Sequence, residues 1–172
     1  MSTGGCIVVV GGTAGIGKEL ARQYAQTGRE TILTGRLADR AQAVAAEADR
    51  SNTRFKLLVE IDCGDHRGGL LPQNEEILVI AGLLAESVAH FEGVLTHAGH
   101  SYGVDERAAV ERIAAQERDA VVQAAERLRA AGHEVDTVSV GSTPTALFAS
   151  DLGGVTELRA GVYTVFDMDQ QS

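Results

Sequence analysis

The sequence predicts an α/β fold of about six mainly parallel strands joined by right-handed βα units. Short runs of β-branched apolar residues alternate with longer helical patterns along nearly the whole chain. Two of these runs end in glycine-rich turns, Gly11–Gly17 and Gly141–Thr145, and each turn opens a helical pattern. Because the carboxyl ends of parallel strands share one edge of a sheet, both turns are expected at the edge where such folds bind ligands.

Each predicted strand is a short apolar run, as strands buried in a parallel sheet are. The first run, Cys6–Val10, stops at the glycine pair Gly11-Gly12. In chain order the predicted strands are Cys6–Val10, Glu30–Thr34, Leu57–Asp62, Gly93–Thr96, Val135–Val140 and one strand within Glu157–Phe166.

The segments between the strands have the patterns of helices. One of them, Glu75–His90, has four apolar residues roughly on one face, which are Ile77, Ile80, Leu84 and Val88. Gly132 follows the longest pattern, at the position where glycine commonly ends a helix. The predicted helices are Gly15–Thr27, Ala38–Ala48, Glu75–His90, Asp105–Ala131 and a short segment, Ala146–Leu152.

Residues 49–56 are polar and lack periodicity, so they are the predicted linker. The linker divides the chain into a segment of residues 1–50 and a segment of residues 57–172. Whether the two segments share one core stays open at this point.

Composition excludes several kinds of partner. The 172 residues carry a formal net charge of −9 and no cluster of Lys and Arg, which argues against nucleic-acid binding. The longest apolar stretch, Ile77–Ala85, is too short to span a bilayer, and the first ten residues lack the basic start of a signal peptide. Cys6 and Cys63 are too few for a disulfide framework. We therefore expect a cytoplasmic protein that has no membrane partner. The two glycine-rich turns, in contrast, lead us to expect a small phosphorylated cofactor.

The first glycine-rich turn carries one resemblance. It follows a strand and opens a helix, so its free N–H groups and the positive helix end favour an anion. Residues 7–48 resemble the opening of a short-chain dehydrogenase/reductase, which implies a Rossmann-like start and the cofactor NADP. The residues that this resemblance implies for NADP are Gly11, Gly15, Ile16, Gly17 and, beside the 2′-phosphate, Arg36.

The catalytic pair of that family is missing from the sequence. The family uses a tyrosine with a lysine four residues further on, and no tyrosine of this chain has that lysine. The resemblance ends near residue 50, and a helix-capping turn without a ligand is the alternative interpretation of Gly11–Gly17. The tyrosines Tyr24, Tyr102 and Tyr163 are followed four residues on by Gly28, Glu106 and Asp167.

Four blocks carry a second resemblance: Val59–Gly69, Thr96–Tyr102, Gly141–Thr145 and Glu157–Tyr163. From about Leu57 to Asp169 the chain resembles half of a fold-type III pyridoxal-phosphate barrel. The likeness is to the D-threonine aldolase and D-serine dehydratase group, whose barrel is like the alanine racemase N-terminal domain. The combined prediction is a Rossmann-like start joined to a half (β/α) barrel in a chimeric chain.

The second resemblance implies a role for each block. Arg67 would lie near the phenolic oxygen of pyridoxal phosphate, and Arg159 would lie toward the ring nitrogen. His97 would pack against the pyridine ring, and Tyr102 would line the pocket. The residues implied for the phosphate are Gly141, Ser142 and Thr143.

Simpler interpretations of the same residues stay open. Arg67 could pair with Asp62 or Asp65 across a turn. His97 could be an ordinary pocket histidine, and Gly141–Thr145 could be only a helix N-cap motif.

The lysine that pyridoxal enzymes need is not in the position the resemblance requires. These enzymes hold the cofactor as a Schiff base on a lysine, which in this family ends the first barrel strand. Lys18 and Lys56 are the two lysines of the chain, and neither occupies that position. No metal site is expected either, because His97 and His100 lie on a strand-to-loop turn without helical i, i+4 geometry.

The sequence therefore predicts a pyridoxal-phosphate-binding protein of the D-threonine aldolase/D-serine dehydratase type, a lyase acting on D-amino acids, with weak or no activity. An NADP-binding oxidoreductase module and a non-catalytic protein that binds a phosphorylated ligand are the alternatives. An incomplete barrel leaves open sheet edges, so self-association is also expected.

Overall fold

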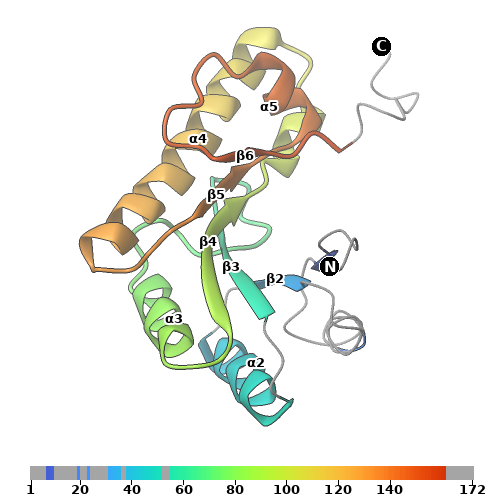
Figure 1. Ribbon diagram of the computed structural model, residues 1–172. Helices are drawn as coiled ribbons and strands as arrows, with labels where there is room; N and C mark the ends of the chain where they lie inside the picture. The colour runs from blue at the N-terminus through green and yellow to red at the C-terminus, as the bar shows by residue number, and fades with distance from the viewer. Residues whose placement is uncertain are drawn as a thin grey trace.

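The computed structural model describes residues 7–9, 19, 23, 31–35, 38–51 and 55–161. In the described part of the chain, the sheet has the strand order β1-β2-β3-β4-β5-β6, and all neighbouring strands are parallel (Figure 1). The predicted α/β fold with parallel strands is thus confirmed. The strands are β1 Ile7–Val9, β2 Thr31–Gly35, β3 Phe55–Ile61, β4 His90–Thr96, β5 Thr137–Val140 and β6 Glu157–Leu158. The helices are α2 Ala38–Ser51, α3 Glu76–Ala85, the short 3-10 helix η1 Gly99–Gly103, α4 Arg107–Ala130 and α5 Thr143–Phe148.

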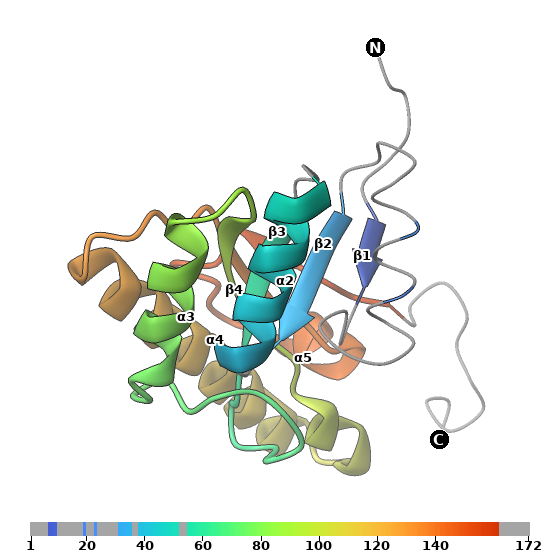
Figure 2. The same cartoon turned by 90° about the horizontal axis from the view of Figure 1, so that it is seen from below.

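The core lies between the sheet and a row of helices in which α2 contacts α3 and α3 contacts α4 (Figure 2). Side chains alternate between the two faces of a strand, so Leu57, Val59 and Ile61 of β3 face this core. Ile61, together with Leu128 of α4, is almost completely buried. Burial of one such side chain contributes about 1.5–3 kcal/mol to stability. The intervening residues of β3, Leu58 and Glu60, line a cavity on the other face.

The Rossmann-like start is not seen in the described residues. A doubly wound sheet has the order 3-2-1-4, in which the chain turns back beside its first strand. Among the described strands β1 lies at the edge, beside β2 alone, and each later strand is added on the same side. That sequential order is the order of a barrel sheet. The turn Gly11–Gly17, Lys18 and Arg36 lie outside the described residues, as does most of the predicted helix 15–27.

The predicted helix Glu75–His90 is too long at its carboxyl end, and the strand predicted after it begins too late. Helix α3 ends at Ala85, and β4 already begins at His90. The Ser87 hydroxyl donates hydrogen bonds to Leu84 O and Ala89 O, each at 3.1 Å. These hydrogen bonds end the helix and begin a tight turn. The spacing of apolar residues does not reveal such a local side-chain to backbone bond, so the sequence pattern placed the helix end too late.

The predicted linker and the predicted last helix also shift. Residues 49–51 belong to α2, whose last turn holds an ion pair between Arg50 and Glu47 at 2.7 Å. Phe55 begins β3 because it is buried in the core. Helix α5 begins at Thr143, earlier than the predicted Ala146, because Ser142 caps it.

The described helices differ from membrane spans in length or in polarity. None of them is both long enough and apolar enough to cross a bilayer. The longest described helix, α4, has 24 residues, but charged residues occur along its length.

Candidate functional site

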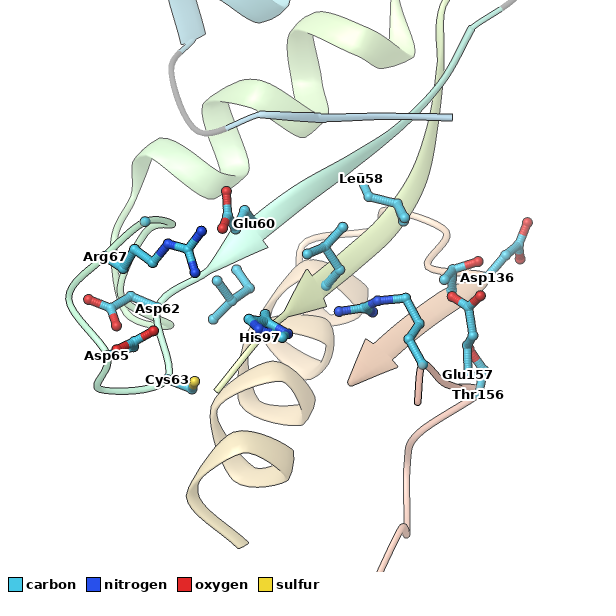
Figure 3. A pocket seen from close by; sticks show the side chains of 15 residues that line it. Leu58, Glu60, Asp62, Cys63, Asp65, Arg67, His97, Asp136, Thr156 and Glu157 are labelled. Atoms are coloured by element: carbon cyan, nitrogen blue, oxygen red, sulfur yellow. The ribbon is translucent and has the colours of Figure 1, made fainter. Parts of the chain in front are cut away.

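A cavity of about 640 Å³ lies on the face of the sheet opposite the helices (Figure 3). We call it the sheet cavity. Its wall combines the apolar side chains of Leu58 and Leu95 with the charged side chains of Glu60, Arg67 and Arg159. Its volume is in the range of about 300–1,000 Å³ that is usual for small-molecule sites. The remaining lining residues are Ile61, Asp62, Cys63, Asp65, Gly68, His97, Asp136, Thr137, Thr156 and Glu157.

Arg159, directly after β6, is a fixed cation of the sheet cavity. Its guanidinium donates to Thr96 O at 2.6 Å and to the hydroxyl of Ser139. The Ser139 hydroxyl in turn donates to Glu157 Oε2 at 2.6 Å. Burial lowers the pKa of Arg159 below its ordinary value, and the negative charge of Glu157 partly opposes this effect. The side chain therefore joins the ends of three strands and presents its charge to the cavity.

Gly141 lets the chain after β5 pass close to Arg159. Its φ is +149°, and an added Cβ would collide with the backbone oxygen of Arg159. Only glycine fits such an approach. Gly141 thus fixes the position of Arg159 through its backbone.

His97, directly after β4, faces the sheet cavity with an oriented ring. Its Nδ1 lies 2.5 Å from Gly141 O, so Nδ1 carries the proton and donates to this carbonyl. Nε2 is then the nitrogen left for a ligand. The His97 ring lies 6.2 Å, between centroids, from the ring of Tyr102.

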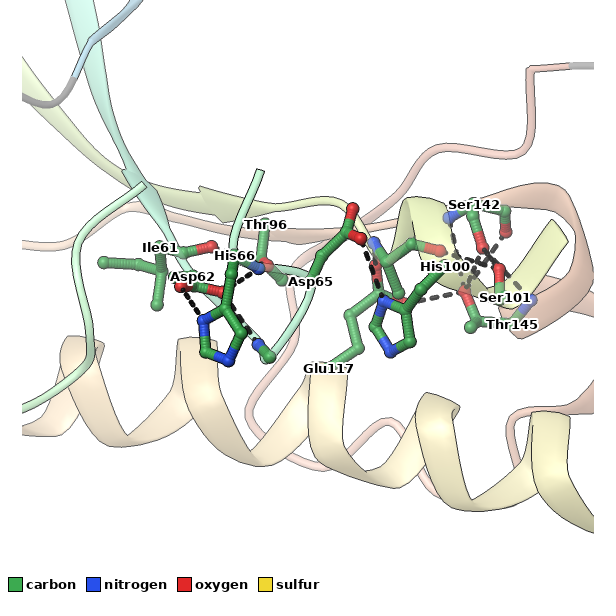
Figure 4. Close-up of polar contacts among 12 residues, drawn as sticks. Ile61, Asp62, Asp65, His66, Thr96, His100, Ser101, Glu117, Ser142 and Thr145 are labelled. Atoms are coloured by element: carbon green, nitrogen blue, oxygen red, sulfur yellow. Dashed lines mark hydrogen bonds and ion pairs between the residues drawn. The ribbon is translucent and has the colours of Figure 1, made fainter. Parts of the chain in front are cut away.

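The loop after β3 places Arg67 beside the sheet cavity. In the same loop Asp62 forms hydrogen bonds with His66. Asp62 Oδ1 accepts hydrogen bonds from Gly64 N at 2.8 Å and His66 N at 3.1 Å, and Oδ2 lies 2.9 Å from His66 Nδ1 (Figure 4). Partial burial raises the pKa of Asp62, but these hydrogen bonds together outweigh burial and hold it below its ordinary value. Among the described residues Arg67 has no carboxylate within 4.0 Å, so the predicted alternative pairing with Asp62 or Asp65 is not formed.

The loop of Gly141–Thr145 is a hydrogen-bonded helix start. Ser142 and Thr145 form a capping box, the N-cap motif that the sequence left as an alternative. Ser142 Oγ also lies 2.7 Å from Ser101 Oγ, and Thr143 N donates to the Tyr102 hydroxyl at 3.1 Å. The N–H groups that would cradle a phosphate thus have partners within the chain, and the phosphate role of this loop stays a prediction.

Glu117 is the residue of this region that sequence reasoning missed. It comes from α4 and is 2% exposed. Its Oε1 accepts hydrogen bonds from Ala98 N at 2.8 Å and Gly141 N at 3.2 Å, and its Oε2 accepts one from Thr145 Oγ1 at 2.7 Å (Figure 4). A signal existed, because Glu117 stands four residues before Val121 on the buried stripe of the helix. A carboxylate on such a stripe needs donors from the neighbouring loops.

The predicted site residues therefore fall into three groups. Arg67, His97 and Arg159 line the sheet cavity. The second group is a hydrogen-bonded cluster beside the cavity, and it contacts the cavity residue His97 through Gly141 O. The members of this group are Tyr102, Gly141, Ser142 and Thr143. The third group lies outside the described residues: Gly11, Gly15, Ile16, Gly17 and Arg36.

Comparison with known proteins gives a family match over nearly the whole chain. The family model described as alanine racemase, N-terminal domain, matches residues 4–169. The D-threo-3-hydroxyaspartate dehydratase of Delftia sp. (strain HT23) is 49% identical over 129 residues, which are 74% of this chain and 34% of that protein. Its solved structure superimposes with a TM-score of 0.85 and 43% identity, covering 90% of this chain and 41% of that chain.

Two further relatives differ in length. The D-serine dehydratase of Dictyostelium discoideum is 30% identical over 126 residues, 68% of this chain and 32% of that protein. An uncharacterized protein of Mycobacterium tuberculosis (strain ATCC 25618 / H37Rv) is 35% identical over 139 residues, 80% of this chain and 78% of that protein. The chain thus spans about a third of the length of the dehydratases but about four fifths of the mycobacterial relative.

These matches correct the chimera interpretation. A single family model runs through residues 4–169, across the predicted linker, so the short-chain dehydrogenase interpretation of residues 7–48 and its NADP site find no support. The physical reason for the error is that a strand, a glycine turn and a helix N-terminus form an anion site in either fold. The resemblance of the longer segment to fold-type III barrels is confirmed.

Proposed function

Because the chain belongs to the family of the alanine racemase N-terminal domain, we propose that it binds pyridoxal phosphate in the sheet cavity. We assign the protein to the type of the D-threonine aldolase/D-serine dehydratase group, which are lyases acting on D-amino acids. We expect this chain to have weak or no turnover. The observation that carries the proposal is the placement of two arginines and an oriented histidine, Arg67, Arg159 and His97, around one cavity of suitable size.

The two arginines of the cavity are suited to the anionic groups of this cofactor, although the same wall carries five carboxylates, those of Glu60, Asp62, Asp65, Asp136 and Glu157. Hydrogen bonds to Thr96 and Ser139 already hold the Arg159 side chain without a ligand. Binding would therefore cost little conformational entropy of this side chain. Arg67 has no carboxylate within 4.0 Å among the described residues, so its charge is available to a phosphate or a phenolic oxygen. His97 keeps Nε2 toward the ligand, since Nδ1 donates to Gly141 O.

The described residues do not fit the covalent linkage of the family. Lys56 is the described lysine, and its Nζ lies 3.0 Å from Glu92 Oε1 at the amino ends of the strands. Arg67 and His97 come after the carboxyl ends of β3 and β4. When bound, pyridoxal phosphate would withdraw electrons from the α-carbon of an amino acid. The described residues place no lysine beside these two side chains, so the binding that we propose rests on Arg67, Arg159 and His97 and involves no covalent bond to Lys56.

A titration of the purified chain with pyridoxal phosphate tests this proposal. Calorimetry and cofactor absorbance should give saturable binding, and borohydride treatment with mass mapping should find no adduct on Lys56. Arg159→Gln should weaken binding at least about 10-fold, because a charge-assisted contact is lost. Arg50→Gln is the matched control, since Arg50 is exposed and pairs with Glu47 on α2. Absence of saturable binding, or equal affinity of Arg159→Gln and wild type, would contradict the proposal.

Self-association is a second proposal, and strand β6, which lies at the edge of the sheet formed by the described residues, supports it. Glu157 and Leu158 are exposed, and Leu158 keeps 42% of its surface in solvent. Unpaired edge strands with apolar side chains tend to pair with a second copy. Sedimentation velocity over a range of micromolar concentrations should show a concentration-dependent oligomer, which Leu158→Lys shifts to monomer. A monomer over the whole range would contradict this proposal.

A further inference from the structure

The amino ends of β4 and β5 bring together one imidazole and two carboxylates. His90 and Glu92 come from the start of β4, and Asp136 directly precedes β5. One potential ligand atom from each residue lies within 4.8 Å of the others. His90 Nε2 and Glu92 Oε2 are 3.5 Å apart. The cluster lies at the opposite strand ends from Arg67 and His97, although Asp136 also lines the far wall of the sheet cavity.

A β-bulge aims Glu92 into this cluster. Leu57 of β3 pairs with Phe91, but the next residue, Leu58, pairs with Gly93. Glu92 is therefore the extra residue on β4. Such bulges re-aim a side chain and are frequent beside functional sites. Phe91 still packs in the core under the helices, so the bulge redirects Glu92 without exposing its neighbour.

A close strand approach brings Asp136 to the same place. Asp136 N donates to Glu92 O at 3.1 Å, and Gly93 pairs with Thr137 in the β4–β5 ladder. An added Cβ on Gly93, whose φ is +147°, would collide with Thr137 O. Glycine at this position therefore permits the short strand separation that sets Asp136 beside Glu92.

Glu92 has one oxygen that the described chain leaves unsatisfied. Oε1 accepts a hydrogen bond from Lys56 Nζ at 3.0 Å. Oε2 is buried and has no hydrogen-bond partner among the described residues, and Glu92 as a whole is only 9% exposed. Burial of a carboxylate oxygen without a donor is unfavourable. A cation between Oε2 and its two neighbours would remove that cost.

We propose that His90, Glu92 and Asp136 bind a divalent transition-metal ion, with Zn²⁺ as the best match. Zn²⁺ accepts imidazole nitrogen and carboxylate oxygen, whereas Mg²⁺ and Ca²⁺ select sites made of oxygen alone. Two ligand atoms at Zn²⁺ bond length in tetrahedral geometry are about 3.4 Å apart, close to the observed separation of His90 Nε2 and Glu92 Oε2. His90 is half exposed, so an ion can enter and keep a water as a further ligand.

Calorimetric titration of the purified chain with Zn²⁺, without pyridoxal phosphate, tests the site. Wild type should bind one Zn²⁺, and Asp136→Asn and His90→Gln should each bind at least about 10-fold more weakly, as expected for loss of one ligand. His66→Gln is the matched control. His66 also lies beside a carboxylate, that of Asp62, but no third ligand lies there among the described residues. Its affinity should equal that of wild type.

Co²⁺ provides a second measurement that needs no variant. Co²⁺ bound to wild type should show visible absorption of a nitrogen and oxygen site, without a thiolate charge-transfer band. A thiolate band would assign the ion to a cysteine and overturn the proposal. Failure of wild type to bind Zn²⁺ saturably, or unchanged affinity in folded Asp136→Asn, would overturn it as well.

Discussion

The Thr145 hydroxyl donates a hydrogen bond to Glu117 Oε2 at 2.7 Å and thereby joins the start of α5 to the buried face of α4. The other oxygen of Glu117 accepts the N–H groups of Ala98 and Gly141, which follow β4 and β5. One carboxylate thus positions the two loops that flank His97. The loops at the carboxyl ends of β4 and β5 consequently depend on a residue of the helix behind them.

Glu117→Leu should destabilise the protein by about 2–4 kcal/mol, because it leaves buried N–H groups without an acceptor. Glu117→Gln keeps one acceptor oxygen and should cost less. Urea unfolding followed by circular dichroism measures both. Glu126→Leu is the control, since Glu126 lies on the exposed side of the same helix and its replacement should change stability by no more than about 0.5 kcal/mol. Equal effects at the two positions would refute a special role of Glu117.

Several features of the fold were predictable because they depend on local patterns. The β3 strand follows from an apolar run, and α4 from a long helical pattern that ends before Gly132. Arg67, His97 and Arg159 could be predicted as neighbours only from the resemblance to fold-type III barrels, and the three side chains do line one cavity.

Other features depend on contacts between distant segments. The register step that makes Glu92 a bulge residue exists only in the pairing of β3 with β4. The donors to Glu117 come from loops 19 and 24 residues away. The Rossmann-like interpretation finds no support for a related reason, since the sequence of one βα unit does not determine the order of the strands in the whole sheet.

Gly141→Ala should destabilise the protein by about 2–4 kcal/mol, because the methyl group would meet the backbone of Arg159 at a φ of +149°. Binding of pyridoxal phosphate should weaken in parallel, since Arg159 must move. Gly82→Ala should change the stability of the protein in the opposite direction. Gly82 lies within α3 and an added Cβ meets nothing within 4 Å, so alanine should stabilise the helix by about 0.5–1 kcal/mol. Thermal unfolding of both variants measures the contrast, and destabilisation by Gly82→Ala would contradict it.

Asp62 should make stability depend on pH in the acid range. Its native pKa lies below the ordinary value of 3.8, so the native state binds fewer protons than the unfolded state in that range. The stabilisation is fully present above the ordinary pKa and is lost as the pH falls through the lower native pKa. Carboxyl NMR titration should show the low pKa directly.

His66→Gln should raise the pKa of Asp62 toward its ordinary value, because it removes the side-chain hydrogen bond and the charge of His66. The loss of stability as the pH falls below the ordinary pKa of Asp62, 3.8, should become smaller. His133→Gln, a change at a histidine remote from Asp62 in the β4–β5 region, is the control. If the pKa of Asp62 is the same in His66→Gln as in wild type, His66 is not a cause of the lowered pKa.

Cys63 should be an inert thiol in the folded protein. Burial is the largest effect and raises its pKa to about 11, although a hydrogen bond with Thr96 acts in the opposite direction. At pH 8 the thiolate fraction is then about 100-fold smaller than for a thiol with the ordinary pKa of 9.0. Iodoacetamide labelling with mass mapping of the Cys63 peptide should show at least this decrease in rate relative to the urea-unfolded chain. Because the unfolded chain serves as its own control, equal labelling rates in the two states would show that Cys63 is not buried.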